Sequence, residues 1–326
     1  MGSVATGIRK AVGCVRFLLG AAALWLPGHV AAQPQGLLPP TDDRDTVAWN
    51  GYFSAWEALA PADAQLWIDR FNHYLNRSRR AEVVLCNVQD TLLLSDELAE
   101  WLILADSTGA EAGRIGERIV FDDALFARAI AAIDRGIELH PDRIDMYLGR
   151  AAAFAYAERY REMAEALCAL IARAGRNGGR WIGTDDLTVQ PIAPQELIAD
   201  YLQDYVNTLF DVASPDGGDE ATDALGRLAR CEAEYAPSSA VALNNLGAWH
   251  YGAGRIGEAL DCFVRASEAD PSDRLLIYNV GYLYRQQGER EQARTWWRRL
   301  LDSPDEAERL RAEKLLRELD AEASAQ

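Results

Sequence analysis

The sequence contains few of the residues that bind metals or act as nucleophiles. It has 4 histidines and 5 cysteines in 326 residues, and neither a His-Glu-x-x-His nor a Cys-x-x-Cys pair occurs. Those spacings are the usual sequence signatures of zinc sites and dithiol redox sites. A glycine-rich phosphate loop and a nucleophile elbow are also missing. The sequence therefore predicts no cofactor, no metal site and no catalytic residues, and it favours a non-enzymatic protein.

Basic residues are outnumbered, and lysine occurs only at Lys10 and Lys314. The chain carries 33 basic and 50 acidic residues, for a formal net charge of -17. Such a surface repels phosphate backbones and anionic headgroups. The charge balance therefore argues against nucleic acid or a membrane surface as a partner, and it would suit a basic peptide or simply keep the protein soluble.

The apolar run at the N-terminus is too short to cross a membrane. Basic residues precede a ten-residue apolar core at 17–26, and small residues follow at 30–32. A spanning helix needs about 20 apolar residues. We expect residues 1–32 to be a cleavable signal peptide and Gln33 to begin an exported protein, in the periplasm or secreted, without stable membrane insertion. The alternative is an uncleaved anchor.

A 34-residue period is present near the C-terminus. Residues of matching type recur at this spacing in the pairs Gly247 and Gly281, Gly254 and Gly288, Ala259 and Ala293, and Phe263 and Trp297. A period of 34 over a helix-turn-helix pattern is typical of tetratricopeptide repeats. Because one such hairpin cannot bury its apolar face alone, the pattern indicates stacked hairpins.

Each repeated position has an expected packing role. Gly247 and Ala259 fall where the two helices of one hairpin cross, so that only small side chains fit. Phe263 is expected to fill the gap between these helices. The remaining structural positions are the helix-ending Gly254, the docking residue Ala266 and the helix-stopping Pro271.

Weaker helical periodicity extends upstream, so the sequence predicts an all-α fold. We expect a right-handed solenoid of helical hairpins with a C-terminal capping helix. The predicted regions are a disordered lead-in at 33–48, a degenerate repeat-like region at 49–238, and residues 239–326, which hold two near-consensus repeats (about 240–273 and 274–303) and the cap. Residues 105–118 and 175–194 are predicted to be long connections. The roles of 81–118 and 175–194 stay open.

Several segments resemble one family. Residues 70–79, RFNHYLNRSR, are similar to the "FNYYxNxSR" segment of exported tetratricopeptide proteins of gut Bacteroidetes. Residues 132–138 and 141–146 resemble that family's "WIDKGIEKYPNRLDMRFGK", and residues 203–205 resemble its "IQDY". The resemblance covers most of the chain after about residue 60 and departs at 81–118. It implies a repeat fold and export but no established activity, and it leaves open whether 70–79 is core or a binding surface.

The cysteines after residue 32 are scattered. Cys168 and Cys262 occupy helical positions where small apolar residues pack. We therefore favour free buried thiols for Cys86, Cys168, Cys231 and Cys262. Disulfide pairing in an exported protein is the alternative.

The candidate binding site is the concave groove lined by the first helices of the two clear repeats. Asparagine can bond a peptide backbone, tyrosine offers amphipathic area, and arginine can pair with a carboxylate. The predicted groove residues are Asn244, Asn245, Tyr251, Tyr278, Asn279, Tyr282 and Arg285.

The leading hypothesis is a non-catalytic exported scaffold that binds a protein or peptide in the cell envelope. A glycan-capture accessory is the alternative from another class, and exposed rings at Trp181 or Trp249 would favour it because sugars stack on aromatic rings. An enzyme is the third hypothesis, and no constellation of residues favours it. The sequence specifies neither the partner nor the oligomeric state.

Overall fold

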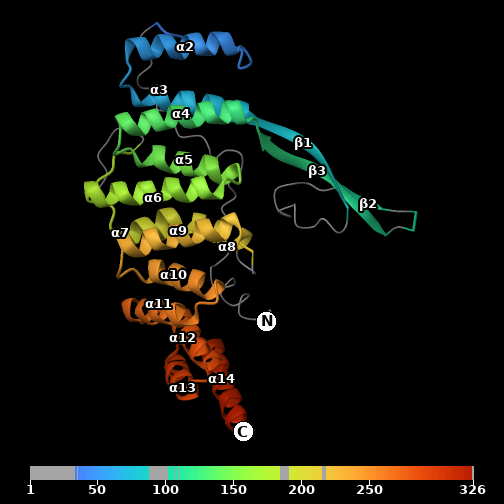
Figure 1. Cartoon of the computed structure of the whole chain (residues 1–326), viewed down its shortest axis with the longest axis vertical. Coiled ribbons are helices and arrows are strands. Elements are labelled where there is room, and N and C mark those ends of the chain that lie inside the picture. The colour runs from blue at the N-terminus through green and yellow to red at the C-terminus, as the bar shows by residue number, and fades with distance from the viewer. Residues whose placement is uncertain are drawn as a thin grey trace. The chain divides into compact units, whose positions relative to one another are not determined.

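The computed structural model divides the chain into two compact units, which meet in sequence at Ala157 and Glu158. We call them the N-terminal unit and the C-terminal unit, and both are mostly helical (Figure 1). The described residues are 34, 36–87, 102–105, 107–108, 110–183, 191–214 and 218–324. The predicted signal peptide, residues 1–32, lies outside them.

The N-terminal unit is built on helices that pack around aromatic side chains. They are α2 (Thr46–Leu59), α3 (Ala64–Ser78), α4 (Asp123–Leu139) and α5 (Ile144–Tyr156). Helix α2 begins inside the segment 33–48 for which the sequence predicts disorder. Asp45 caps it, since its carboxylate accepts hydrogen bonds from the backbone N–H groups of Val47 (3.1 Å) and Ala48 (2.9 Å). Phe53 and Trp56 bury the inner face of this helix.

Helices α3 and α4 approach each other closely at a glycine. A Cβ atom placed on Gly136 would lie 3.0 Å from the Trp67 Cβ and 3.0 Å from the Met146 sulfur. A methyl group at this position would require Trp67 and the Met146 side chain to move by a few tenths of an ångström. This contact sets the spacing of the helices that form the pocket described below.

A small antiparallel sheet corrects the all-α prediction. Its strands are β1 (Arg79–Asn87), β2 (Leu102–Ala105) and β3 (Glu111–Phe121), in the order β1-β3-β2. Strand β1 follows α3 directly and β3 leads into α4, so the sheet extends away from the end of this helix pair (Figure 1). The predicted loop at 105–118 is wrong over most of β3, where apolar residues at Ile115 and Ile119 belong to an alternating strand pattern.

One face of the sheet is apolar and exposed. Leu85 and Leu102 both lie opposite Ile115, and paired residues of an antiparallel sheet point to the same side. Since side chains alternate along a strand, Val83 and Leu104 share this face. Val83, Leu85 and Leu102 are 70%, 68% and 70% exposed. Glu117, opposite Val83, shares this face, and the exposed Ile103 lies on the other one, so this side of the sheet is mainly but not wholly apolar.

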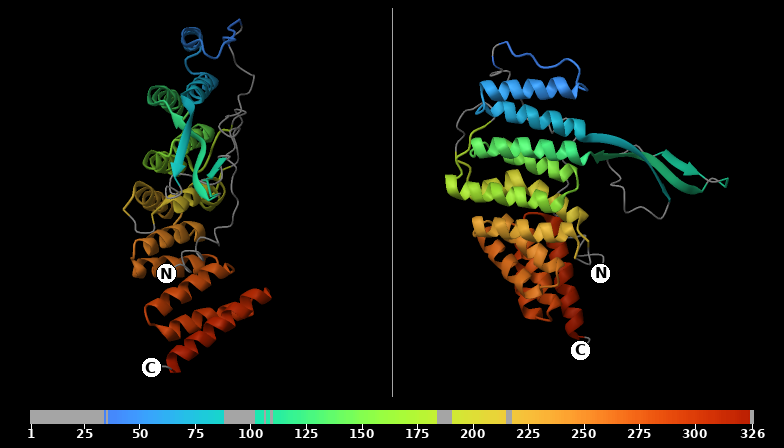
Figure 2. Two further views of the ribbon diagram at one scale, coloured as in Figure 1. Left: turned by 90° about the vertical axis from the view of Figure 1, so that its right-hand side faces the viewer. Right: turned by 45° about the horizontal axis from the view of Figure 1, so that its top comes forward.

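The C-terminal unit is a succession of helices. They are α6 (Tyr160–Asn177), α7 (Pro194–Glu196), the π-helical turn η2 (Leu197–Leu202), α8 (Gln203–Val212), α9 (Glu220–Tyr235), α10 (Ala240–Gly252), α11 (Ile256–Ala269), α12 (Arg274–Gln286), α13 (Arg290–Arg298), the 3-10 turn η3 (Arg299–Asp302) and α14 (Glu306–Ser324). Helices α10 and α11 pair, α12 and α13 pair, and α14 lies alongside α13 (Figure 2).

The structure places the repeated glycines beneath aromatic rings. A Cβ on Gly247 would lie 2.9 Å from the Phe263 ring, and a Cβ on Gly281 would lie 2.4 Å from the Trp297 ring. Gly254 has φ 72° and follows the end of α10, and Gly288 has φ 80° after α12. The other repeat positions are the fully buried Ala259, Ala266 and Ala293, and the exposed Pro271 between α11 and α12.

The connection after α6 is anchored where the structure describes it. Helix α6 continues to Asn177, and Gly179 follows with φ 72°. The Ile192 N–H donates to the Gly179 carbonyl at 2.9 Å, and Trp181 is fully buried. Residues 184–190 lie outside the described part. The two ends of the predicted connection at 175–194 are therefore held together.

A disulfide bond corrects the cysteine prediction. Cys168 on α6 is bonded to Cys231 on α9, with their Cα atoms 5.8 Å apart and a sequence separation of 63 residues. Cys262 is free and buried, as predicted. The side chain of Cys86 lies outside the described residues. A helical pattern could not reveal this pair, because it reports which face a cysteine occupies and not which distant helix packs against it.

We expect Cys168→Ala combined with Cys231→Ala to lower the free energy of unfolding by about 4 kcal/mol, because the bond restricts a long loop of the unfolded chain. Urea denaturation of the mature chain measures this loss of stability. Reducing the disulfide of the wild type should cause the same loss. Cys262→Ala is the control and should keep the response to reductant. An unfolding midpoint that reductant leaves unchanged would contradict the disulfide.

Candidate functional site

Three tyrosines form a continuous row on α10 and α12. The rings of Tyr278 and Tyr282 stack with their centroids 6.3 Å apart. The Gln286 side-chain amide donates to the Tyr282 hydroxyl at 2.8 Å and to the Tyr251 hydroxyl at 3.4 Å. All three rings are half-buried and Gln286 is exposed. We call Tyr251, Tyr278 and Tyr282 the tyrosine row.

Two of the three predicted groove asparagines are buried. Asn245 is 1% exposed, and its amide nitrogen donates to the Glu232 carboxylate at 2.9 Å and to Gln203 at 3.1 Å. Asn279 is also buried, and Asn244 is half-buried. Asn245 therefore bonds the preceding helices of its own unit and does not present its amide to an open groove.

Arg285 is engaged by the C-terminal helix. Its guanidinium pairs with Glu318 at 3.3 Å and also with Glu322, both on α14. From the same helix, the Arg311 guanidinium lies 4.2 Å from the centre of the Tyr278 ring. The predicted role of Arg285, pairing with a carboxylate, is thus filled within the chain, and α14 covers one end of the tyrosine row.

A buried carboxylate lies behind this surface. Glu232 is fully buried, and its Oε1 has no hydrogen-bond partner among the described residues. Burial raises the pKa of Glu232 from 4.5 to about 7, partly opposed by the hydrogen bond from Asn245. Gln203, which follows the π-helical turn η2, bonds the same Asn245 amide. The cluster ties the start of α8 to α9 and α10 through a group that is half-ionised near neutral pH.

The tryptophans that would favour glycan capture do not present free rings. Trp181 is fully buried. Trp249 is half-buried, with the guanidinium carbons of Arg230 and Arg255 4.7 Å and 4.1 Å from its ring centre. A Cβ on Gly226 would lie 2.2 Å from the same ring. Neither tryptophan therefore presents the exposed ring that would favour the glycan hypothesis.

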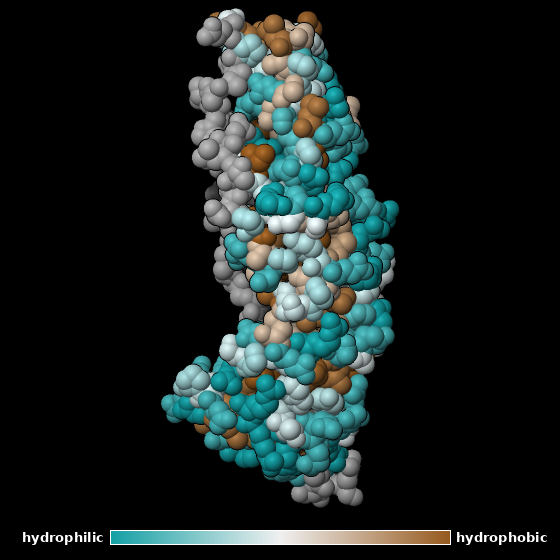
Figure 3. Space-filling view, turned by 90° about the vertical axis from the view of Figure 1, so that its left-hand side faces the viewer, coloured by the Kyte–Doolittle hydropathy of each residue, from teal (hydrophilic) through white to brown (hydrophobic). Residues whose placement is uncertain are grey.

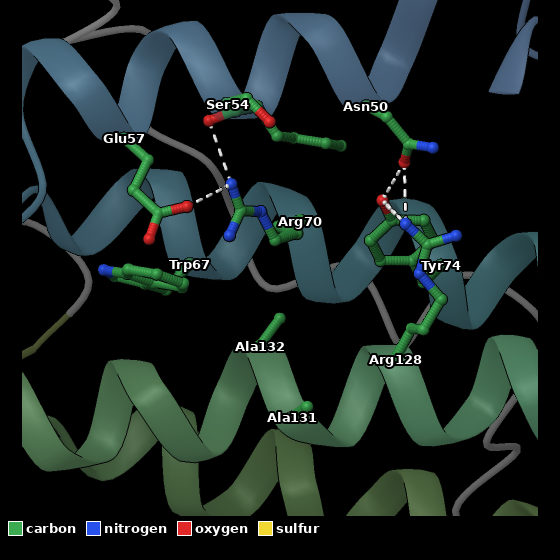
Figure 4. A pocket seen from close by; sticks show the side chains of 10 residues that line it. Asn50, Ser54, Glu57, Trp67, Arg70, Tyr74, Arg128, Ala131 and Ala132 are labelled. Atoms are coloured by element: carbon green, nitrogen blue, oxygen red, sulfur yellow. Dashed lines mark hydrogen bonds and ion pairs between the residues drawn. The ribbon is translucent and has the colours of Figure 1, made fainter. Parts of the chain in front are cut away.

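The N-terminal unit contains a pocket that sequence reasoning missed. It has a volume of about 320 Å³ and lies between α2, α3 and α4 (Figure 4). The small residues of α4 leave this space open opposite the aromatic residues of α2 and α3. The lining residues are Asn50, Phe53, Ser54, Glu57, Trp67, Arg70, Tyr74, Arg128, Ala131 and Ala132.

Two arginines in the pocket are held differently. The Arg70 Nη2 donates to the Phe53 carbonyl at 2.9 Å and pairs with the Glu57 carboxylate at 2.9 Å. The Arg128 Nη2 donates to Asn50 Oδ1 and to the Tyr74 hydroxyl, each at 2.7 Å. The Tyr74 hydroxyl itself donates to Asn50 at 2.5 Å. Arg70 is therefore neutralised within the pocket, whereas Arg128 is positioned by uncharged groups (Figure 4).

The positive charge of Arg128 contributes to lowering the pKa of the nearby His73. The His73 ring stacks on Trp49 with centroids 4.3 Å apart. Burial, together with the charges of Arg77 and Arg128, lowers the pKa of His73 to about 4, against an opposite effect of Asp43. His73 is therefore neutral at physiological pH and packs among the rings of Trp49, Phe53 and Tyr74. The available sequence signal was the resemblance at 70–79, which contains Arg70 and Tyr74.

One face of the molecule is mainly hydrophilic. Figure 3 shows one face of the molecule on which apolar residues occur in small separate patches. Within the described part of the chain, no group of three or more His, Cys, Asp or Glu residues is placed to hold a metal ion. Nor is any described helix long and apolar enough to cross a bilayer. The tyrosine row and the α2–α4 pocket are the two candidate sites.

No protein-family model matches the chain, and no curated protein matches it. One solved structure that does match is YrrB, described as a TPR protein with an unusual peptide-binding site. It is 19% identical, with a TM-score of 0.36, and the match covers 80% of this chain and 97% of that chain. The candidate sites therefore rest on the geometry of this chain.

We expect Glu232→Gln to stabilise the protein at alkaline pH. Because the folded-state pKa is raised, the contribution of Glu232 to stability is complete below pH 4.5 and is lost as the pH rises through 7. The amide cannot ionise, so the variant should gain roughly 3 kcal/mol over the wild type above pH 8. Urea denaturation across pH measures this gain, and the exposed Glu234→Gln is the control. Parallel pH profiles for the Glu232 variant and the wild type would contradict the assignment.

Proposed function

We propose that the chain is an exported, non-catalytic scaffold that binds a peptide or protein segment at the tyrosine row. The observation that carries the proposal is the row itself, in which half-buried rings are joined through one exposed glutamine. Tyrosine combines apolar area with a hydrogen-bonding tip and loses little rotamer entropy on contact, which is why it is enriched in binding surfaces.

The charges around the row favour a neutral or basic segment. Arg285 is already paired with Glu318 and Glu322. A partner carboxylate would have to displace these groups and would meet a chain of net charge -17. We therefore propose that recognition depends on tyrosine contacts and hydrogen bonds, and that an acidic peptide terminus is disfavoured.

The proposed architecture is a tetratricopeptide-like array closed by α14. The paired helices α10–α11 and α12–α13 follow the 34-residue period, and this supports the repeat assignment. Ala312 and Leu319 of α14 are fully buried in a cluster with Trp297, and the Arg294–Asp320 ion pair joins α13 to α14 at 2.5 Å. These contacts support a capping role, because a cap buries an apolar side against the last repeat and leaves a charged side to solvent.

The proposed location is outside the reducing cytoplasm. The Cys168–Cys231 bond supports it, since structural disulfides persist in oxidising compartments. The basic and apolar pattern of residues 1–32 supports a signal peptide.

Binding at the tyrosine row can be tested with a peptide library. When a library of random displayed peptides is selected for binding to the mature chain, we expect a family of neutral or basic sequences to be enriched. Tyr282→Ala should weaken an enriched peptide about tenfold, because a central aromatic contact is lost. Fluorescence anisotropy with a labelled peptide measures the affinity, and thermal unfolding verifies that the variant folds.

Two variants at neighbouring positions of α12 test whether binding depends on the tyrosine row or on another part of this helix. Gln286→Ala removes the side chain that joins two tyrosine hydroxyls, and Gln287→Ala alters its exposed neighbour. We expect weaker binding for the first and unchanged binding for the second. No enriched peptide, or equal affinities for Gln286→Ala, Tyr282→Ala and the wild type, would refute binding at the row.

Export can be tested independently. The full chain expressed in a Gram-negative host should yield a periplasmic or secreted product that begins at Gln33 and contains one intramolecular disulfide. Intact mass before and after reduction, with N-terminal sequencing, measures both properties. A membrane-bound product that retains residue 1 would show an anchor instead.

A further inference from the structure

Exposed apolar side chains are concentrated on one face of the three-stranded sheet. Among the described residues, twelve large apolar side chains are exposed, and six of them lie in the strands β1, β2 and β3. Five of these six share the face that contains Ile115, and each is 40–70% exposed; they are Val83, Leu85, Leu102, Leu104 and Ile119. Single exposed apolar residues are normal, whereas a contiguous group indicates a contact surface.

The opposite face of the sheet is charged. On that face, Glu82 lies opposite Arg118, and Arg114 lies opposite Ile103. The sheet is therefore amphipathic, like one layer of a β-sandwich, in which one side is solvated and the other packs against a second sheet. Because the charged side is suited to water, the apolar side is the one that would gain from a partner.

The charge of the strands favours a second copy of this chain as that partner. The described strands contain four arginines and three glutamates, for a net charge of +1, whereas the whole chain has a net charge of -17. Two copies can therefore meet at the sheet without the like-charge repulsion that opposes contact elsewhere. An anionic lipid surface would be repelled by the rest of the chain.

The projection of the sheet also reduces repulsion between copies. Strand β1 has nine residues and spans about 30 Å, and the sheet points away from the end of the α3–α4 pair (Figure 1). If the free end of each sheet covers the helix-proximal end of the other, the two α3–α4 pairs stay about 30 Å apart. That separation is about three Debye lengths at physiological salt, so charge repulsion between these helices is largely screened.

The size of the apolar face is sufficient for a dimer. The five exposed side chains leave on the order of 500 Å² of apolar surface in water, which is near the upper end of the largest patches on monomers. Stacking two such faces would remove on the order of 1,000 Å², about the minimum for a specific interface. Packed sheets lie about 10 Å apart, with the side chains of their inner faces interdigitated.

We propose that the apolar face of the sheet is a homodimer interface, at which the sheets of two chains stack face to face as the two layers of a β-sandwich. Twofold symmetry places Val83, Leu85 and Leu102 of both copies in the contact. Strand β2 pairs with β3 only from Glu111 to Ile115, so Glu117 lies at an open edge and can stay at the rim. The interface lies within the N-terminal unit and does not depend on peptide binding at the tyrosine row.

Sedimentation equilibrium of the mature chain tests the proposal. We expect the wild type to have the mass of a dimer. Leu102→Glu should weaken the dimer at least about tenfold, because each copy would place a carboxylate in the apolar contact. Ile103→Glu is the matched control, since Ile103 is the next residue of β2, is 63% exposed and lies on the opposite face. We expect this control to dimerise as the wild type does.

Three results would overturn the proposal. They are a wild type that stays monomeric up to millimolar concentration, a dimer that both substitutions weaken equally, and a dimer that neither weakens. Leu102 is 70% exposed in a single chain, so Leu102→Glu removes little packing within the monomer, and circular dichroism verifies that each variant folds. Flotation with phosphatidylcholine vesicles tests the other occupant. Vesicle binding by a monomeric chain that Leu102→Glu abolishes would show a lipid surface instead of a second copy.

Discussion

The close approach of helices at glycine positions is the constraint on which the structure depends. Gly226, Gly247 and Gly281 each lie against an aromatic ring of a neighbouring helix, at distances that an added methyl group could not occupy unless the ring moved, and Gly136 is nearly as close to Trp67 and Met146. The aromatic rings of Phe263 and Trp297 then fill the space between paired helices. At these contacts the spacing determines which side chains emerge between adjacent helices and which are enclosed.

The apolar periodicity of the sequence predicted most helices correctly. The predictions failed where a structure depends on contacts with residues far away in the sequence. The 34-residue period identified Gly247 and Gly281 because close packing restricts the residue type. It could not show that Asn245 turns toward Glu232, since that contact comes from the preceding helix. The sheet at 79–121 was missed because strand alternation there follows a helix without a break. The partners Cys168 and Cys231 are 63 residues apart, beyond any local pattern.

The two candidate sites differ in the groups that contact their arginine. Beside the tyrosine row, Arg285 is paired with carboxylates of α14, which leaves aromatic and amide groups as the available chemistry. In the α2–α4 pocket, Arg128 is positioned by Asn50 and Tyr74, which carry no opposite charge. A paired arginine stabilises its own chain, whereas an arginine oriented by neutral groups keeps its charge available for a ligand. Pairing, and not the mere presence of arginine, thus distinguishes the two surfaces.

The disulfide also determines how part of the C-terminal unit can open. Cys168 and Cys231 close a covalent ring that contains η2 and α8, the π-helical turn and the helix that follows it. If the segment inside this ring unfolds locally, the disulfide still joins α6 to α9. The amide hydrogens of the segment can then exchange with solvent while its two ends stay together. A proteolytic cut within the ring would likewise leave both fragments joined until the bond is reduced.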